Sequence, residues 1–368
     1  MSHYLFSARA VAGRSFSASE VSDEAGMSFL EVPVGALEHV PAMRIAKSLW
    51  LKRIIAQAVA AKRAAMKAYY QRTGGTPSVN DRQERADLVF FLHGYNNDLR
   101  TVLWRHQALA RTLAANEFWG SVVSFDWPCG TSVAAYLVDR SKAHDSARFL
   151  VEDGFKALAA ITSPDCEVNL HVVAHSMGSY VLQESFRYAS VAYSDVVTDQ
   201  WGLQQVALVG ADLACNDFKA EGDSMYFVRR ATRVTNYVTS CDEALKASNI
   251  KHRTTPFPGE FNWSDRIGRK GLASDLAPDA VNCYDVNCDA FYAAAVGAMQ
   301  DEEYLASIGF PKKNVIADRP CVSHSWHVGN ATFAKDLVDT LHGDVDRNVI
   351  ATRSLDARGR LVLAPPAP

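Results

Sequence analysis

Short apolar segments alternate with helical segments through the middle of this 368-residue chain, and this alternation restricts the possible folds most strongly. Five segments carry nearly unbroken apolar side chains, as strands buried on both faces do: residues 88–92, 121–125, 168–174, 205–210 and 233–239. Helix-like segments lie between or after them: residues 101–116, 133–161, 177–192 and 243–248. Strands and helices in this order form parallel sheets. The sequence therefore predicts an α/β fold, with a mostly parallel sheet and helices on both faces.

The segments outside this alternation are expected to surround the core. Residues 1–84 are predicted to form an N-terminal extension with one strand and one basic amphipathic helix. The core is assigned to residues 85–250 and 321–345. Residues 251–320 are interpreted as an inserted lid, because the alternation stops there. Residues 346–368 are expected to form a partly disordered tail.

Charge and cysteine content exclude several classes of protein. The 38 Lys and Arg nearly balance the 41 Asp and Glu, which argues against a general nucleic-acid-binding protein. No apolar run is long enough to span a membrane, and the start lacks the apolar core of a secretory signal. The seven cysteines are scattered and odd in number, so no disulfide framework is indicated. A reducing cytoplasm is the expected location.

The motif with the clearest chemistry follows the strand predicted at residues 168–174. Residues 174–178 are Ala-His-Ser-Met-Gly, and a helical segment comes next. Strand, sharp turn, serine and helix form the nucleophile elbow, in which small residues stand two positions before and after the serine. Ala174 replaces the usual first glycine, and Gly178 is retained. This geometry predicts that the Ser176 hydroxyl is lifted clear of the sheet.

The chain resembles the α/β-hydrolase fold, and more narrowly an uncharacterised bacterial family of serine hydrolases. The segments that carry the resemblance are residues 91–97, 124–128, 136–141, 174–178, 210–212, 240–245, 266–268 and 324–326. Together they cover roughly residues 85–345, so the N-terminal segment lies outside the resemblance. The resemblance implies that the oxyanion hole is formed by the backbone N–H groups of Tyr95 and Met177.

The fold also implies the chain order serine, acid, histidine. Asp242 follows the second strand after the nucleophile strand, and His324 precedes the last predicted helix, residues 331–341. Ser176, Asp242 and His324 are therefore the expected triad. Asp212 remains an alternative acid and His327 an alternative base.

The expected chemistry is hydrolysis of a carboxylic ester through an acyl-enzyme, as in an esterase or a lipase-like enzyme. His324 would deprotonate Ser176, and Asp242 would stabilise the imidazolium that forms. An acyltransferase, thioesterase or amidase would use the same triad. An alternative of another class is a binding protein with a dormant hydrolase site.

The substrate is expected to be a small-molecule or lipid-like ester, with no organic cofactor and no metal. The residues expected to contact it are His93, Gly94, His175, Trp127 and Tyr136. The spacing of Cys321, His324 and His327 resembles a metal site, but no second such cluster exists. The sequence does not indicate an oligomeric state.

The basic helix expected at residues 44–72 has two interpretations. Eight Lys or Arg residues and no acidic residue occur there. The helix is interpreted as packed on the core with a solvated basic face. Peripheral contact with an anionic membrane is the alternative.

Overall fold

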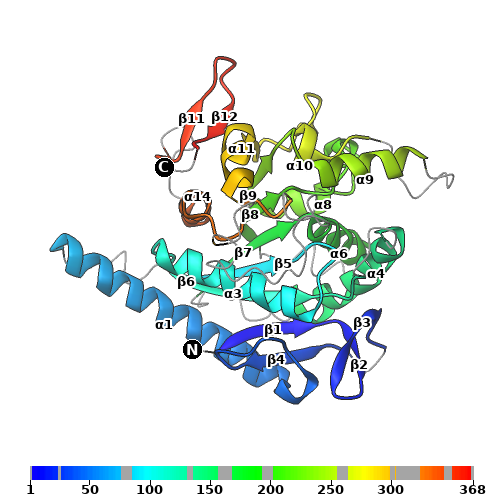
Figure 1. The fold of residues 1–368 in the computed structure, drawn as a ribbon, viewed down its shortest axis with the longest axis vertical. Helices are drawn as coiled ribbons and strands as arrows, with labels where there is room; N and C mark the ends of the chain where they lie inside the picture. The colour runs from blue at the N-terminus through cyan, green and yellow to red at the C-terminus, as the bar shows by residue number, and fades with distance from the viewer. Residues whose placement is uncertain are drawn as a thin grey trace.

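The computed structural model describes residues 2–23, 26–75, 85–130, 136–155, 168–192, 202–254, 264–298, 303, 324–343 and 350–365. A ten-stranded sheet runs through the molecule in the order β11-β12-β10-β9-β8-β7-β5-β6-β1-β4 (Figure 1). The eight strands from β12 to β1 in this order are mutually parallel. The two edge strands, β4 and β11, are antiparallel to their neighbours.

The centre of the sheet consists of the five strands that the sequence predicted. These are β5 (Ala86–Leu92), β6 (Gly120–Asp126), β7 (Val168–His175), β8 (Leu203–Val209) and β9 (Ala231–Val238). The predicted α/β class with a mostly parallel sheet is confirmed. Every residue of β5 is buried, because helices cover both faces of the sheet.

Successive side chains of the central strands face opposite layers of helices, as the twofold repeat of a strand requires. On β5, Leu88 and Phe90 face the layer of α1 (Lys47–Thr73), α4 (Tyr136–Phe149) and α6 (Gly178–Ala192). Val89 and Phe91 face the layer of α3 (Leu99–Ala115), α11 (Asp289–Ala298) and α14 (Ala331–His342). The sheet is thus the shared wall of two apolar cores.

The N-terminal segment belongs to the central sheet, which corrects its expected place outside the core. β1 (His3–Ser7) pairs in parallel with β6, and β4 (Ser28–Val32) pairs with β1. Between them, β2 (Arg9–Ala12) and β3 (Ser15–Val21) form a separate hairpin. The predicted strand of this segment is β4. β1 was missed because one run of five residues carries no sign of its distant parallel partner.

A buried ion pair ties this N-terminal segment to the central strands. Arg9 Nε donates to Asp126 Oδ1 over 2.7 Å, and both side chains are fully buried. Ser7 and His39 also contact the Asp126 carboxylate. Burial by itself raises the pKa of Asp126, but Arg9 and His39 outweigh it and hold that pKa well below its ordinary value. The charge therefore stays paired at neutral pH.

The C-terminal segments also add strands, so the expected lid and tail are partly core. β10 (Cys283–Asn287) pairs in parallel with β9. β12 (Leu361–Leu363) and β11 (Arg353–Leu355) continue the sheet beyond it. Within the predicted lid, residues 255–263, 299–302 and 304–320 lie outside the described residues. The other elements are α9 (Glu243–Thr254), α8 (Met225–Val228), α10 (Ile267–Lys270), the π-helix η3 (Leu150–Phe155) and the 3₁₀ turns η1 (Pro41–Met43) and η4 (Cys215–Phe218).

The basic helix α1 uses its apolar face for packing. Trp50, Ile54 and Ala58 are buried in the core, and the helix runs along one end of the molecule (Figure 1). A contact with a lipid surface would therefore rest on the basic side chains, and it stays a prediction. None of the helices in the described parts of the chain has the length and apolar content needed to cross a membrane.

Candidate active site

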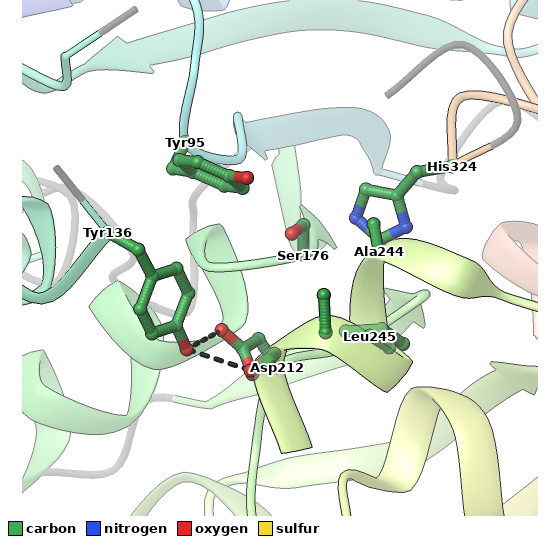
Figure 2. A pocket seen from close by; sticks show the side chains of 9 residues that line it. Tyr95, Tyr136, Ser176, Asp212, Ala244, Leu245 and His324 are labelled. Atoms are coloured by element: carbon green, nitrogen blue, oxygen red, sulfur yellow. Dashed lines mark hydrogen bonds between the residues drawn. The ribbon is translucent and has the colours of Figure 1, made fainter. Parts of the chain in front are cut away.

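A pocket lies at the carboxyl edge of the sheet, where residues following β5, β7 and β8 meet the loops after β9 and before α14. Figure 2 shows the side chains around it, which belong to Tyr95, Tyr136, Ser176, Asp212, Ala244, Leu245, Ala247, Ser248 and His324. The free volume is about 20 Å³ for the centre of a water-sized sphere, which is room for about one water. The pocket is therefore narrow.

Ser176 occupies the sharp turn between β7 and α6. Its φ is 55°, in the left-handed region that non-glycine residues rarely adopt. Ser176 N donates to Val209 O at the end of β8, which holds the turn against the neighbouring strand. A Cβ atom at Gly178 would lie 2.3 Å from Leu92 O, so only glycine allows helix and strand to approach this closely. The backbone thus has the strained conformation expected of a nucleophile elbow.

His324 and Asp242 form a buried pair beside this turn. Asp242 lies between the end of β9 and the start of α9, and its Oδ2 lies 2.6 Å from His324 Nδ1. Asp242 Oδ1 also accepts from Leu245 N, so the same carboxylate caps α9. These contacts fix the orientation of the imidazole through Nδ1 and leave Nε2 available to accept or donate a proton. His324 Nε2 is buried and has no hydrogen-bond partner among the described residues.

The Ser176 hydroxyl is not hydrogen-bonded to His324 in this conformation. Figure 2 shows the Ser176 oxygen pointing away from the imidazole, although both side chains line the same pocket. Rotation about χ1 between staggered positions changes the direction of this hydroxyl without moving the backbone. Hydrogen bonds between nucleophile and base are often long or misaligned before substrate binds.

Asp212, the alternative acid, contacts a different set of groups. Its Oδ2 accepts from Tyr136 Oη at 2.5 Å, and its Oδ1 accepts from Ser248 Oγ at 2.9 Å. Arg266 Nε lies 3.4 Å from the same carboxylate. Burial and the Asp212 charge raise the pKa of Tyr136, which stays a neutral donor. The histidine contact belongs to Asp242 and not to Asp212.

His327, the alternative base, packs against the His175 ring. The His175 ring lies 4.7 Å from the His324 ring and 4.6 Å from the His327 ring, measured between centroids. Burial lowers the pKa values of His175 and His327, with smaller effects from neighbouring charges. His175 Nε2 lies 3.2 Å from His324 O, and its N–H group donates to this carbonyl and supports the backbone around His324. Neither His175 nor His327 lines the pocket.

The two expected oxyanion donors lie at the nucleophile turn and on the loop of residues 93–97. Met177 N–H follows Ser176 directly and donates to no acceptor within the described ranges. A Cβ atom at Gly94 would lie 2.8 Å from Ser176 Cβ, so this loop lies directly against Ser176. Tyr95 lines the pocket beside Ser176.

Two other expected substrate contacts, His93 and Trp127, lie beneath the loop instead of in the pocket wall. Both are fully buried, and their rings stack with centroids 5.4 Å apart. Trp127 Nε1 donates to His93 O, so the pair supports the backbone of the loop. Of the five expected substrate residues, Tyr136 lines the pocket and Gly94 adjoins Ser176.

The first turns of α9 supply a pocket wall that the sequence analysis did not assign. Ala244, Leu245, Ala247 and Ser248 face Ser176 across the cavity. The sequence could have indicated this wall, because these residues directly follow Asp242 at the start of α9. Cys321 of the considered metal spacing lies outside the described residues. Within the described ranges, no group of three His, Cys, Asp or Glu side chains could hold a metal ion.

The sequence model of one protein family, described as alpha/beta hydrolase of unknown function (DUF900), matches residues 76–259. This segment contains Ser176 and Asp242 and ends before His324. No curated protein matches the sequence significantly.

The solved structures to which this chain is similar include a cutinase and an esterase. A Trichoderma reesei cutinase in complex with a phosphonate inhibitor is 15% identical, with a TM-score of 0.23, over 47% of this chain and 70% of its own. A Pyrobaculum calidifontis esterase is 14% identical, with a TM-score of 0.28, over 69% of this chain and 78% of its own.

Proposed function

We propose that this chain, which belongs to the family of alpha/beta hydrolases of unknown function, is a serine hydrolase that cleaves carboxylic esters. The observation that carries the proposal is the 2.6 Å contact between Asp242 and His324, in a pocket that also contains the strained Ser176. A buried imidazole with a carboxylate on Nδ1 and an unused Nε2 is arranged to accept a proton from a hydroxyl.

The reaction follows from this arrangement. Ser176 Oγ attacks the ester carbonyl while His324 Nε2 takes the hydroxyl proton. Asp242 stabilises the imidazolium, and the Met177 and Tyr95 N–H groups hold the oxyanion. The alcohol leaves with the proton from His324, and an acyl group remains on Ser176. Water, deprotonated by His324, then releases the acid.

The narrow pocket favours small acyl groups. Ala244, Leu245 and Ala247 close the cavity opposite Ser176, and its free volume is about that of one water. An acetyl group needs less displacement of these side chains than an octanoyl group. We therefore expect p-nitrophenyl acetate to be hydrolysed with a higher kcat/KM than p-nitrophenyl octanoate.

The test combines a fluorophosphonate probe with p-nitrophenyl esters of graded chain length. The wild type should be labelled covalently and should release p-nitrophenol. Ser176→Ala should lose both properties, because the probe bonds to the nucleophilic oxygen. Ser190→Ala, on the same helix and away from the pocket, is the matched control and should retain both.

Two results would contradict the proposal. A wild type that neither reacts with the probe nor hydrolyses any ester would favour a dormant binding protein. Labelling with turnover of only thioesters or amides, or transfer to an added alcohol, would favour the thioesterase, amidase or acyltransferase alternatives.

A further inference from the structure

One buried guanidinium joins the two loops that lie on opposite sides of Ser176. Arg105 belongs to α3, and its side chain is almost completely buried. Its Nε donates to Asn97 Oδ1 at 2.9 Å, on the loop that contains Tyr95. Its Nη2 donates to Ser325 Oγ at 2.7 Å, next to His324. A single side chain thus contacts both the loop of residues 93–97, here called the oxyanion loop, and the loop that carries His324 and Ser325, here called the base loop.

The contact with Arg105 fixes which way the Asn97 amide points. A guanidinium only donates hydrogen bonds, so the atom that faces it must be the amide oxygen. The Asn97 Nδ2 group is then directed toward the loop backbone. It donates to Gly94 O at 2.6 Å and to Tyr95 O at 3.1 Å.

The bond to Gly94 O in turn determines the direction of the Tyr95 N–H. Gly94 C=O and Tyr95 N–H belong to one planar trans peptide, so they point in opposite directions. Asn97 and the ring of His93 hold the Gly94 oxygen on one side of the loop. The N–H group of Tyr95 must therefore point to the other side of the same peptide. A flipped peptide would present a carbonyl oxygen instead of a donor.

The other arm of Arg105 acts on the loop that carries His324. Ser325 is fully buried and follows His324 directly. The bond between Arg105 Nη2 and Ser325 Oγ holds this stretch of backbone against α3. The same backbone is contacted by His175 through His324 O. Arg105 thus helps to set the position of the base as well as the direction of the oxyanion donor.

We propose that Arg105 is a positioning residue that holds the oxyanion loop and the base loop in register around Ser176, acting through Asn97 and Ser325. This inference rests on the proposed function. A lysine cannot replace the guanidinium, because one ammonium group cannot reproduce its planar fork with donors in two fixed directions. The positioning role therefore depends on the shape of Arg105 in addition to its charge.

The experiment compares Arg105→Lys, Asn97→Asp and Arg100→Gln with the wild type, using p-nitrophenyl acetate and the fluorophosphonate probe. Arg105→Lys keeps the charge. Asn97→Asp keeps an acceptor for Arg105 but removes the donor to Gly94 O. Both should lower kcat by about 10²-fold with KM changed less than about threefold, since a misdirected oxyanion donor affects the transition state most. Arg100, on the same helix and exposed, should tolerate its substitution.

A double-substitution cycle tests whether Arg105 and Ser325 act together. Ser325→Ala should lower kcat, and adding it to Arg105→Lys should cost less than the two separate losses combined. Wild-type kcat in both Arg105→Lys and Asn97→Asp would overturn this inference alone. A higher KM and a lower melting temperature with an unchanged kcat would also overturn it, because that pattern indicates a merely structural role. If Arg105→Lys does not fold, Asn97→Asp and Ser325→Ala still test the two arms of the guanidinium separately. An unreactive wild type would overturn the proposed function and this inference with it.

Discussion

The ends of the neighbouring strands β8 and β9 each lead to a buried carboxylate, and the two carboxylates have different surroundings. Asp242, after β9, contacts one imidazole and the first turn of α9. Asp212, after β8, contacts Tyr136, Ser248 and Arg266. A carboxylate whose oxygens already contact hydroxyls and a guanidinium gains little from also binding an imidazolium. The comparison indicates that partners, more than position at the sheet edge, separate a chemical role from a structural one.

The two candidate bases, His324 and His327, should differ in the same way as the two carboxylates. Their substitution gives the largest expected effect. His324→Ala should lower kcat by about 10⁵-fold or more, because the nucleophile and the base act as one unit. His327→Ala should retain most of the activity, since the His327 ring packs on His175 and does not line the pocket. Steady-state kinetics with p-nitrophenyl acetate measure both. The opposite result would make His327 the base and remove the significance of Asp242.

Asp242→Asn should lower kcat by about 10⁴-fold and leave the protein folded. An amide at this position favours the wrong imidazole tautomer. It still provides an oxygen for Leu245 N, so the cap of α9 is kept. Kinetics and a melting curve of the same preparation separate the two effects. Near-normal turnover in Asp242→Asn would refute the assignment of the acid.

Asp212→Asn should reverse this pattern, with a large change in stability and a small one in rate. The substitution removes the negative charge that faces the buried Arg266, and breaking such a pair costs roughly 3 kcal/mol. The melting temperature should fall, while kcat should change less than about tenfold. Thermal unfolding and ester hydrolysis check the two expectations. A loss of rate as large as that in Asp242→Asn would erase the contrast between the two carboxylates.

Buried histidines should make the stability of the protein depend on pH. Burial lowers the pKa values of His175 and His327 well below their ordinary range and that of His106 to about 3. Below about pH 6.5 the unfolded chain binds protons at these positions and the folded chain does not. The free energy of unfolding should therefore fall as the pH is lowered, by about 1.4 kcal/mol per pH unit for each such histidine.

Denaturant unfolding between pH 7 and pH 5 measures this slope. His106→Gln should make it shallower by the contribution of one histidine, whatever its effect on stability at pH 7. An unchanged slope in this variant would show that His106 is protonated in the folded protein.

The sequence predicted the centre of the fold because apolar-rich strands alternate there with helical segments. β5 and β7 are buried over nearly their whole length, so their composition alone identifies them. β10, in contrast, is only five residues long, and just two of these residues are buried. Its place in the sheet depends on its pairing with β9, which a local pattern does not contain.

The candidate site was predictable where chain order carries it and unpredictable where single buried contacts do. Ser176, Asp242 and His324 stand at positions that the fold relates to strand ends. Arg105 looks like any basic residue of a surface helix, and only the folded structure brings it to Asn97. Trp127 was expected in the pocket wall because an aromatic residue after a strand looks available. In the structure it is fully buried beneath the loop.

The backbone of Ser176 has a consequence for engineering this enzyme. A side chain held at a φ of 55° costs about 1–2 kcal/mol that glycine would not incur. Ser176→Gly should therefore melt at a higher temperature than the natural chain while being inert toward esters. A selection for heat resistance that ignores turnover would favour loss of the oxygen on which the proposed hydrolysis depends.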